Sequence, residues 1–273
     1  MKLAIKFMLD KFKEIIENSI NERQLVGVTH AGIFHSDDLA CSALLHLYCE
    51  KLGIEFKLVR IYEETKIPVG KNVIVYDMGN GILDHSKEEE KVDGRNLSSL
   101  GKLWRFGKEE FKKEFGISER LWNRIDKDLI CPIDKTDTAS KMNPLTYWLN
   151  SLRCVCVEDQ WETCFDQFLE IWKPILKASK VMTEESAELK KAPLLTINGK
   201  RFRFTDRWIS GFDDRVDGHI WKDTDGTYKI RMFKDGELKL KGIKNGENTN
   251  IIYVNASGRN GQVRSLDDLK TII

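Results

Sequence analysis

The stretch that decides the fold is LVGVTHAGIFHSDDLACSALLHL, which covers residues 25–47. Its first five residues, 25–29, form an apolar run that predicts a short buried strand. A loop over 30–36 follows, and the apolar spacing over 37–52 then predicts a helix with aspartates in its first turn. A strand, a loop and a helix in this order indicate an α/β layer.

The segments on either side of this stretch extend the α/β pattern. Residues 55–61 alternate between polar and apolar side chains, which predicts a strand. Residues 72–77 form an apolar run closed by an aspartate, which is typical of an interior parallel strand. Apolar residues at helical spacing between 5 and 20 predict an amphipathic first helix, and helical patterns dominate from about 97 to 180. We therefore predict an α/β domain with a parallel sheet over residues 1–180.

The last third of the chain has a different character. The segment 177–193 is polar and charged, and we place a linker at 181–192 within it. Beyond it, Asn198-Gly199 between two short runs of strand-forming residues is a hairpin signal. We therefore predict a smaller, β-rich α+β domain over residues 193–273.

The composition narrows the class of protein. The chain has 273 residues, 44 basic and 43 acidic side chains, and 41% hydrophobic residues, which is an ordinary globular composition. A net charge of +1 argues against a cationic coat for nucleic acid. Residues 1–189 carry 27 basic and 32 acidic side chains, whereas residues 190–273 carry 17 and 11. The acidic part suits a site for cations, and the basic part suits a surface for anions.

Targeting and redox signals in the sequence point to the cytoplasm. No stretch approaches the roughly 18–20 apolar residues of a membrane span, and Lys6 interrupts an apolar N-terminal run that has no small-residue cleavage site. The six cysteines show no CxxC spacing, so we expect reduced, mostly buried thiols rather than a structural zinc site. These features predict a cytoplasmic protein with no membrane partner.

Aspartate and histidine residues follow the ends of apolar runs at four places in the acidic part. These places are 29–38, 77–81, 84–86 and 134–138. Since sites in open α/β sheets form outside the carboxyl ends of the strands, we expect these places to bring their acids together. Crowded carboxylates raise one another's pKa unless a cation holds them. Mixed His and Asp ligands suit Mn²⁺, Zn²⁺ or iron better than Ca²⁺.

Each place taken alone also has a structural interpretation. A pair such as Asp37 and Asp38 at a helix start is often only a cap that interacts with the helix dipole. A histidine beside a buried strand is usually satisfied by local hydrogen bonds. We interpret His46 and His219, which lie outside the four places, as structural residues.

Three motifs occur in a fixed order: Thr29-His30-x-Gly32-x-Phe34-His35-x-Asp37-Asp38, Asp77-x-Gly79 and Asp84-His85. Together they resemble the DHH phosphoesterase superfamily and, within it, the melanocyte-proliferating-gene (Myg) family of metal-dependent nucleases. Three later segments are similar to motifs of that family: Leu97-Ser98-Ser99-x-Gly101 at a helix start, Asp134-x-x-Asp137, and a small-residue loop over 253–262. The resemblance runs nearly the whole chain. It implies a DHH-type phosphoesterase domain followed by a smaller substrate-binding domain.

The resemblance implies a site for two divalent metals, commonly Mn²⁺, with Mg²⁺, Zn²⁺ or iron as the other choices. The ligands that it implies are His30, His35, Asp37, Asp38, Asp77, His85 and Asp137. Asp77 would bridge the two metals, and Asp38 would either be a ligand or support one. Asp84 and Asp134 are the implied catalytic residues: Asp84 would orient His85, and Asp134 is the alternative to Asp137.

The resemblance also implies which residues hold the substrate. These are Ser86, Ser257, Gly258, Arg259, Asn260 and Gly261. Arg259 suits a bidentate contact with a phosphate group. The chain departs from the family pattern at Ser86 and Asn255, where the family usually has histidines, and at Gln262, where it has a glycine.

The implied activity is phosphodiester hydrolysis by a water activated between two metals, and the first hypothesis is an exonuclease for single-stranded nucleic acid or short oligonucleotides. A second hypothesis is a phosphodiesterase for dinucleotides or cyclic nucleotides, because the modest net charge favours short substrates. A third is a degenerate protein that binds metal or nucleotide without turnover, which the three departures motivate.

The basic and aromatic pattern of the last third of the chain, and its oligomeric state, each have two interpretations. Basic and aromatic residues interleave over 201–231, as in surfaces that hold a nucleotide. The same interleaving is typical of an amphipathic sheet with one solvated face. The sequence also leaves open whether the chain forms a homodimer.

Overall fold

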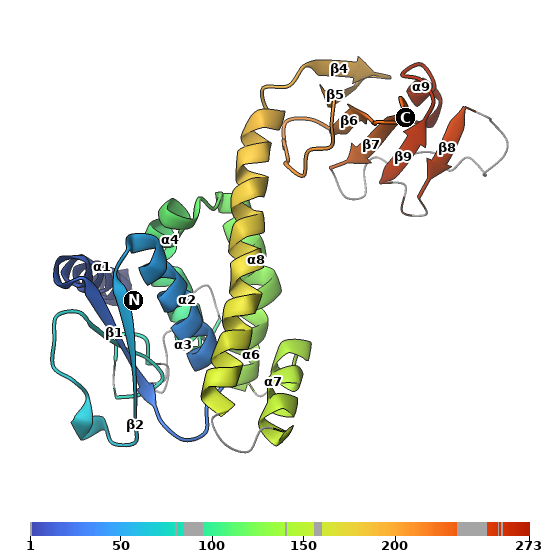
Figure 1. Cartoon of the computed structure of the whole chain (residues 1–273). Helices are drawn as coiled ribbons and strands as arrows, with labels where there is room; N and C mark the ends of the chain where they lie inside the picture. The colour runs from blue at the N-terminus through green and yellow to red at the C-terminus, as the bar shows by residue number, and fades with distance from the viewer. Residues whose placement is uncertain are drawn as a thin grey trace. The chain divides into compact units, whose positions relative to one another are not determined.

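The structure is a computed structural model of the whole chain (Figure 1). It describes residues 2–79, 81–84, 95–139, 141–155, 160–233, 250–255, 257 and 259–273. The chain divides into two compact units, Met1–Ser179 and Lys180–Ile273. The predicted mixed α/β class is confirmed, because the first unit contains a three-stranded parallel sheet and the second contains a separate six-stranded mixed sheet.

The first unit opens with the predicted alternation of helices and strands. In chain order its elements are α1 (Lys2–Glu22), β1 (Gln24–His30), α2 (Ser36–Leu52), β2 (Glu55–Ile61), the 3₁₀ helix η1 (Glu64–Lys66) and β3 (Val73–Val75). The sheet order is β2-β1-β3 with parallel pairing, so β1 is the central strand. Helices α1 and α2 both pack against β1 (Figure 1), which explains why residues 25–29 are buried and apolar.

Helix α2 is buried along most of its length, and its sequence is accordingly apolar on nearly every side. It begins at Ser36, one residue before the predicted start. It ends at Leu52, and the C-cap residue Gly53 has a left-handed backbone (φ 67°), a conformation that favours glycine. In β1, Gly27 permits a close approach, because a Cβ atom there would stand 2.8 Å from the ring of Phe56 in β2.

The rest of the first unit is helical, as the periodicity predicts. Its elements are α3 (Ser99–Phe106), α4 (Lys108–Phe115), α5 (Glu119–Ile125), the π-helical turn η2 (Asp126–Ile130), α6 (Cys131–Ala139), α7 (Pro144–Val155) and α8 (Gln160–Leu189). Trp104 of α3 stacks on Trp122 of α5 with 3.5 Å between ring centroids, and lies 5.8 Å from Trp172 of α8. These indoles join the helices into one core.

The segment 181–192, which was predicted as a linker, is mostly helical. Helix α8 continues through it as far as Leu189, and residues 190–192 turn toward the next strand. Glu, Lys, Ala and Met are strong helix formers, so the polarity of this segment is that of a solvated helix. The boundary between the two compact units falls between Ser179 and Lys180.

The second unit is built mainly from strands. Its elements are β4 (Leu194–Ile197), β5 (Lys200–Thr205), β6 (Gly218–Lys222), β7 (Tyr228–Met232), β8 (Ile251–Val254), β9 (Asn260–Val263) and the short helix α9 (Leu269–Ile272). The sheet order is β4-β5-β6-β7-β9-β8, with a parallel β5–β6 pair and antiparallel pairs elsewhere. The predicted hairpin is confirmed: Asn198 and Gly199 both have left-handed backbones and join β4 to β5.

The core of the second unit lies on one face of this sheet. Phe202, Ile220 and Ile230 from the strands pack with Leu269 and Ile272 of α9. Across both units, no helix in the described part of the chain is long and apolar enough to cross a membrane.

Candidate metal centre

The carboxyl edge of the parallel sheet gathers histidine and aspartate side chains. β1 ends at His30, and Asp77 follows β3. Val28 of β1 pairs with Val75 of β3, so His30 and Asp77 both lie two residues beyond a paired position. The parallel register therefore brings them together, and His30 Nε2 lies 2.9 Å from Asp77 Oδ2.

His35, the residue before α2, extends this pair into a cluster. Its Nδ1 lies 3.7 Å from Asp77 Oδ2, and its ring centroid lies 5.7 Å from that of His30. Potential ligand atoms of His30, His35 and Asp77 all lie within 4.8 Å of one another. His35, Asp37 and Asp137 form a second group within the same distance. The structure therefore brings five of the predicted ligands to one place, with His35 in both groups.

Asp38 is fully buried in the first turn of α2. Its Oδ1 accepts the backbone N–H groups of His35 at 3.0 Å and Leu39 at 2.7 Å, and its Oδ2 lies 3.3 Å from His30 Nε2. Burial, together with the nearby Asp37 and Asp77, raises the pKa of Asp38 well above its ordinary value. These contacts are those of a residue that caps α2 and supports the two histidines, which is one of the two predicted roles.

Ser99, in the predicted helix-start motif, ties the cluster to α3. It donates its backbone N–H to Asp37 Oδ2 at 3.2 Å, and its hydroxyl accepts the backbone N–H of Asp77 at 2.9 Å. Asp77 has a left-handed backbone (φ 55°), a conformation that is uncommon in residues with a Cβ atom but that aspartate adopts more readily than most. The hydrogen bond to Ser99 helps to hold Asp77 in this conformation.

The two aspartates of the fourth motif have different surroundings. Asp134 is fully buried: its Oδ1 accepts the backbone N–H of Ser98 at 3.0 Å and its hydroxyl at 2.7 Å, and its Oδ2 lies 3.1 Å from Arg95 Nε. Burial nevertheless raises the pKa of Asp134 to about 6. A Cβ atom at Gly101 would collide with this carboxylate. Asp134 therefore anchors α3 to α6, whereas Asp137 faces the histidine cluster.

Arg60, at the end of β2, holds the loop that carries the two histidines, and the sequence analysis missed it. Its Nη2 donates to the carbonyl oxygen of Gly32 at 3.0 Å. Its guanidinium carbon lies 4.1 Å from the ring centroid of Trp161 and 5.8 Å from that of Phe34. Phe34 and Trp161 also meet edge to face. The sequence signal for Arg60 was a basic residue at the end of a strand, beside a glycine-containing loop. The contact with Trp161 gave no signal, because Arg60 and Trp161 are far apart in the sequence.

The third predicted place is described only in part. Asp84 is buried, and its backbone carbonyl accepts a hydrogen bond from Lys102 Nζ at 2.6 Å. His85 and Ser86 lie outside the described residues, as does Gly258 of the predicted substrate loop.

The predicted substrate loop of the second unit is closed by Asn255. Its Oδ1 accepts the backbone N–H groups of Arg259 at 2.9 Å and Asn260 at 3.1 Å. Asn260 and Gly261 belong to β9 and pair with residues of β7. Of the predicted substrate-binding residues of this loop that the structure describes, Ser257 and Arg259 are exposed.

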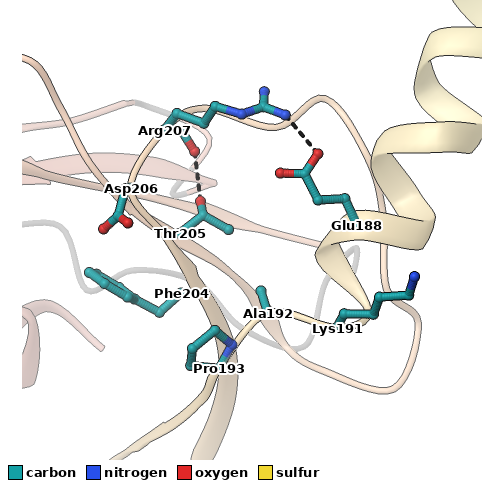
Figure 2. A pocket seen from close by; sticks show the side chains of 8 residues that line it. All are labelled: Glu188, Lys191, Ala192, Pro193, Phe204, Thr205, Asp206 and Arg207. Atoms are coloured by element: carbon teal, nitrogen blue, oxygen red, sulfur yellow. Dashed lines mark hydrogen bonds and ion pairs between the residues drawn. The ribbon is translucent and has the colours of Figure 1, made fainter.

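A pocket of about 670 Å³ lies elsewhere in the second unit. Figure 2 shows its lining residues: Glu188, Lys191, Ala192, Pro193, Phe204, Thr205, Asp206 and Arg207. Arg207 Nη2 donates to Glu188 Oε2 at 2.7 Å, and the Thr205 hydroxyl donates to the Arg207 carbonyl at 2.6 Å. Strands β6 and β7 separate β5, which lines this pocket, from β9. The predicted substrate loop and this pocket are therefore different parts of the unit.

Most of the interleaved cations of the second unit have partners within that unit. Arg203 Nε lies 2.9 Å from Asp213 Oδ2, and Lys229 forms an ion pair with Asp223. The guanidinium carbon of Arg231 lies 4.5 Å from the ring centroid of Trp208. These contacts favour the interpretation of the basic and aromatic pattern as part of the fold.

The donor set at the sheet edge fits a divalent metal. It combines imidazole nitrogens with carboxylate oxygens, a mixture that suits Mn²⁺, Zn²⁺ or iron. The hydrogen bond to Asp77 raises the pKa of His35, to which the charges of Asp37 and Asp137 also contribute. A metal and a proton would compete for His35, because a histidine ligand must be unprotonated.

No protein-family model matches the chain, and no curated protein matches it. The fold and the candidate site therefore define the class of this protein in structural terms. The chain is a mixed α/β protein whose parallel sheet carries a group of histidines and aspartates at its carboxyl edge.

Proposed function

We propose that this protein is a DHH-type, metal-dependent phosphoesterase of the Myg branch, which hydrolyses phosphodiester bonds in single-stranded nucleic acid or short oligonucleotides. The observation that carries the proposal is the pair of adjacent donor groups that share His35. A two-metal site requires neighbouring sets of ligands, which these two groups would supply with His35 binding one metal only, and two-metal sites are typical of phosphodiester hydrolysis.

The residues that would hold the two metals are His30, His35, Asp37, Asp77 and Asp137. When bound, divalent metals there would stabilise negative charge on a phosphoryl oxygen and make a water more acidic. The remaining residues act on the ligands. Asp38 holds the histidines through its two carboxylate oxygens, and Ser99 fixes the backbone of Asp77.

The charge distribution supports a short substrate. Long nucleic acids bind through many phosphate contacts with basic side chains. In the second unit, Arg203, Arg207 and Lys229 each form an ion pair with an acid of the same unit. Because these cations are engaged internally, we infer that substrate recognition is local to the scissile phosphate and its nearest nucleosides.

A metal-binding protein without turnover is the second candidate, and Asn255 favours it. Its side chain closes the loop through hydrogen bonds to two backbone N–H groups. An amide used in this way stabilises the loop, whereas the histidine of the family pattern would be available to a substrate.

The experiment uses the purified full chain after treatment with EDTA. The stoichiometry and affinity of Mn²⁺ binding are measured by calorimetry, and cleavage is followed on labelled single-stranded DNA, RNA, linear dinucleotides and cyclic dinucleotides. We expect Mn²⁺-dependent cleavage in the wild type and a loss of roughly 100-fold or more in Asp77→Asn, which removes a ligand.

Asp126→Asn is the matched control. Asp126 is a partly buried aspartate of the same unit that pairs with Arg95 and belongs to neither donor group. Tight Mn²⁺ binding without cleavage of any substrate would favour the second candidate. Absence of both binding and cleavage would contradict both candidates.

A further inference from the structure

An exposed aromatic side chain stands beside the candidate metal centre. Tyr62 directly follows β2, and 83% of its surface is exposed, whereas Tyr48 and Tyr76 of the same unit are buried. Ile61 pairs with His30 across the two strands, so Tyr62 lies one residue beyond the register position of a proposed ligand. Tyr62 and the metal-ligand cluster therefore share the carboxyl edge of the sheet.

The loop that Tyr62 contacts is held in place. Gly32 has a left-handed backbone (φ 86°), and a Cβ atom there would lie 3.5 Å from Tyr62 Cε1. The carbonyl of Gly32 accepts the hydrogen bond from Arg60, and the backbone N–H of Ala31 donates to the Ile61 carbonyl at 2.7 Å. These two hydrogen bonds to backbone groups thus order the loop near the Tyr62 ring.

A second apolar side chain is exposed in the same loop. Ile33 is 70% exposed, next to Gly32 and two residues before His35. A single exposed apolar residue needs no explanation. Here an aromatic ring and an aliphatic side chain stand at the loop that carries the proposed ligands, where a substrate would have to lie.

We propose that Tyr62, together with the exposed Ile33 of the 30–36 loop, is the stacking surface for the nucleobase adjacent to the scissile phosphate. This inference rests on the proposed function. Neighbouring strands are about 4.8 Å apart, so a phosphate at His30 and Asp77 leaves its nucleoside within reach of the end of β2. Stacking on a ring recognises the flat face of any base. Tyr62 therefore selects substrates that have a base at this position and discriminates little among the four bases.

The test compares two dinucleotides that differ in one base. One carries both bases, and the other carries an abasic sugar on one side of the phosphate; both placements of the abasic sugar are used. The quantity measured is the ratio of kcat/KM for the complete dinucleotide to that for the abasic one. We expect Tyr62→Ala to lower this ratio about tenfold, chiefly through KM, for one placement of the abasic sugar. Tyr62→Phe should retain the wild-type ratio, because it keeps the ring.

Tyr147→Ala is the matched control, since Tyr147 is a 69% exposed tyrosine of α7 and belongs to neither donor group. An unchanged ratio in Tyr62→Ala, or an equal fall in Tyr147→Ala, would overturn the inference while leaving phosphodiester hydrolysis intact. A wild type that cleaves neither dinucleotide nor the single-stranded DNA and RNA substrates would overturn the proposed function, and the inference with it.

Discussion

Buried aspartates have opposite surroundings in the two units. At the sheet edge of the first unit, Asp38 and Asp77 contact histidines, and burial with neighbouring carboxylates raises the pKa of Asp38. In the second unit, Asp213 is also buried, but it accepts hydrogen bonds from Arg215 and Arg203, which lower its pKa below the usual range. An acid held by arginines stabilises a fold. An acid crowded against histidines and other acids costs energy that a bound cation would offset.

The largest expected effect lies in the second unit. Asp213→Ala would leave the guanidinium groups of Arg203 and Arg215 without their common partner. We expect the free energy of unfolding to fall by about 3 kcal/mol. Denaturant titration followed by tryptophan fluorescence measures this change. Asp214→Ala, at an exposed neighbour, should change it by less than about 0.5 kcal/mol, and an equal loss in both variants would contradict the assignment.

Metal should relieve the crowding in the first unit. At a Mn²⁺ concentration about 100 times Kd, we expect the protein to gain about 2.7 kcal/mol in its free energy of unfolding. Asp77→Asn should lose this gain, because it removes a ligand shared by the His30 and His35 contacts. Thermal unfolding in Mn²⁺ and in EDTA measures the difference. A wild type with the same melting temperature in both would argue against a metal site.

Asp134 lies between the two extremes, because it touches Arg95 and yet has a pKa raised to about 6 by burial. A raised pKa means that the folded state binds the proton more tightly than the unfolded state. The contribution of this group is therefore most favourable below about pH 4 and is lost as pH rises through about 6. We expect a loss of roughly 2–3 kcal/mol between these values, which Asp134→Asn should remove. Denaturant unfolding of the wild type and of Asp134→Asn across this pH range measures how the free energy of unfolding changes with pH. Equal changes in the two proteins would refute the prediction.

The smallest expected effect concerns the loop that holds the histidines. Arg60→Lys keeps the charge but loses the planar group that contacts Trp161 and the hydrogen-bond geometry to Gly32. We expect Mn²⁺ affinity to fall about fivefold to tenfold with little change in unfolding free energy. Calorimetric titration checks this, with Arg124→Lys, at an exposed arginine of α5, as the control. Equal Mn²⁺ affinity in wild type and Arg60→Lys would show that Arg60 is not needed to keep the loop in place.

Local patterns predicted the parts of the molecule that depend on neighbouring residues. The apolar run at 25–29 and the helix after it are both present, because burial on both faces of a central strand requires such a run. The hairpin at Asn198-Gly199 follows from backbone preferences of two residues. The gathering of His30 and Asp77 could also be anticipated, since parallel strands end at one edge.

Features that depend on distant contacts could not be predicted in this way. Asp134 and Asp137 lie in one helix, and the resemblance favours Asp137 as the ligand, but the contacts that bury and hold Asp134 come from Ser98 and Arg95, far away in sequence. The contact of Arg60 with Trp161 has the same character. The polar segment before Leu189 is helical because its residues favour helices, although its charge resembled a linker.

The left-handed backbone of Asp77 restricts how this protein can change during evolution. Glycine, asparagine and aspartate adopt that conformation at low cost, and β-branched or bulky residues do not. A descendant that abandons the proposed metal site but keeps the fold would therefore be expected to carry asparagine or glycine at position 77. The residue at position 77 would therefore distinguish a descendant that lost only the ligand from one that also lost this backbone conformation.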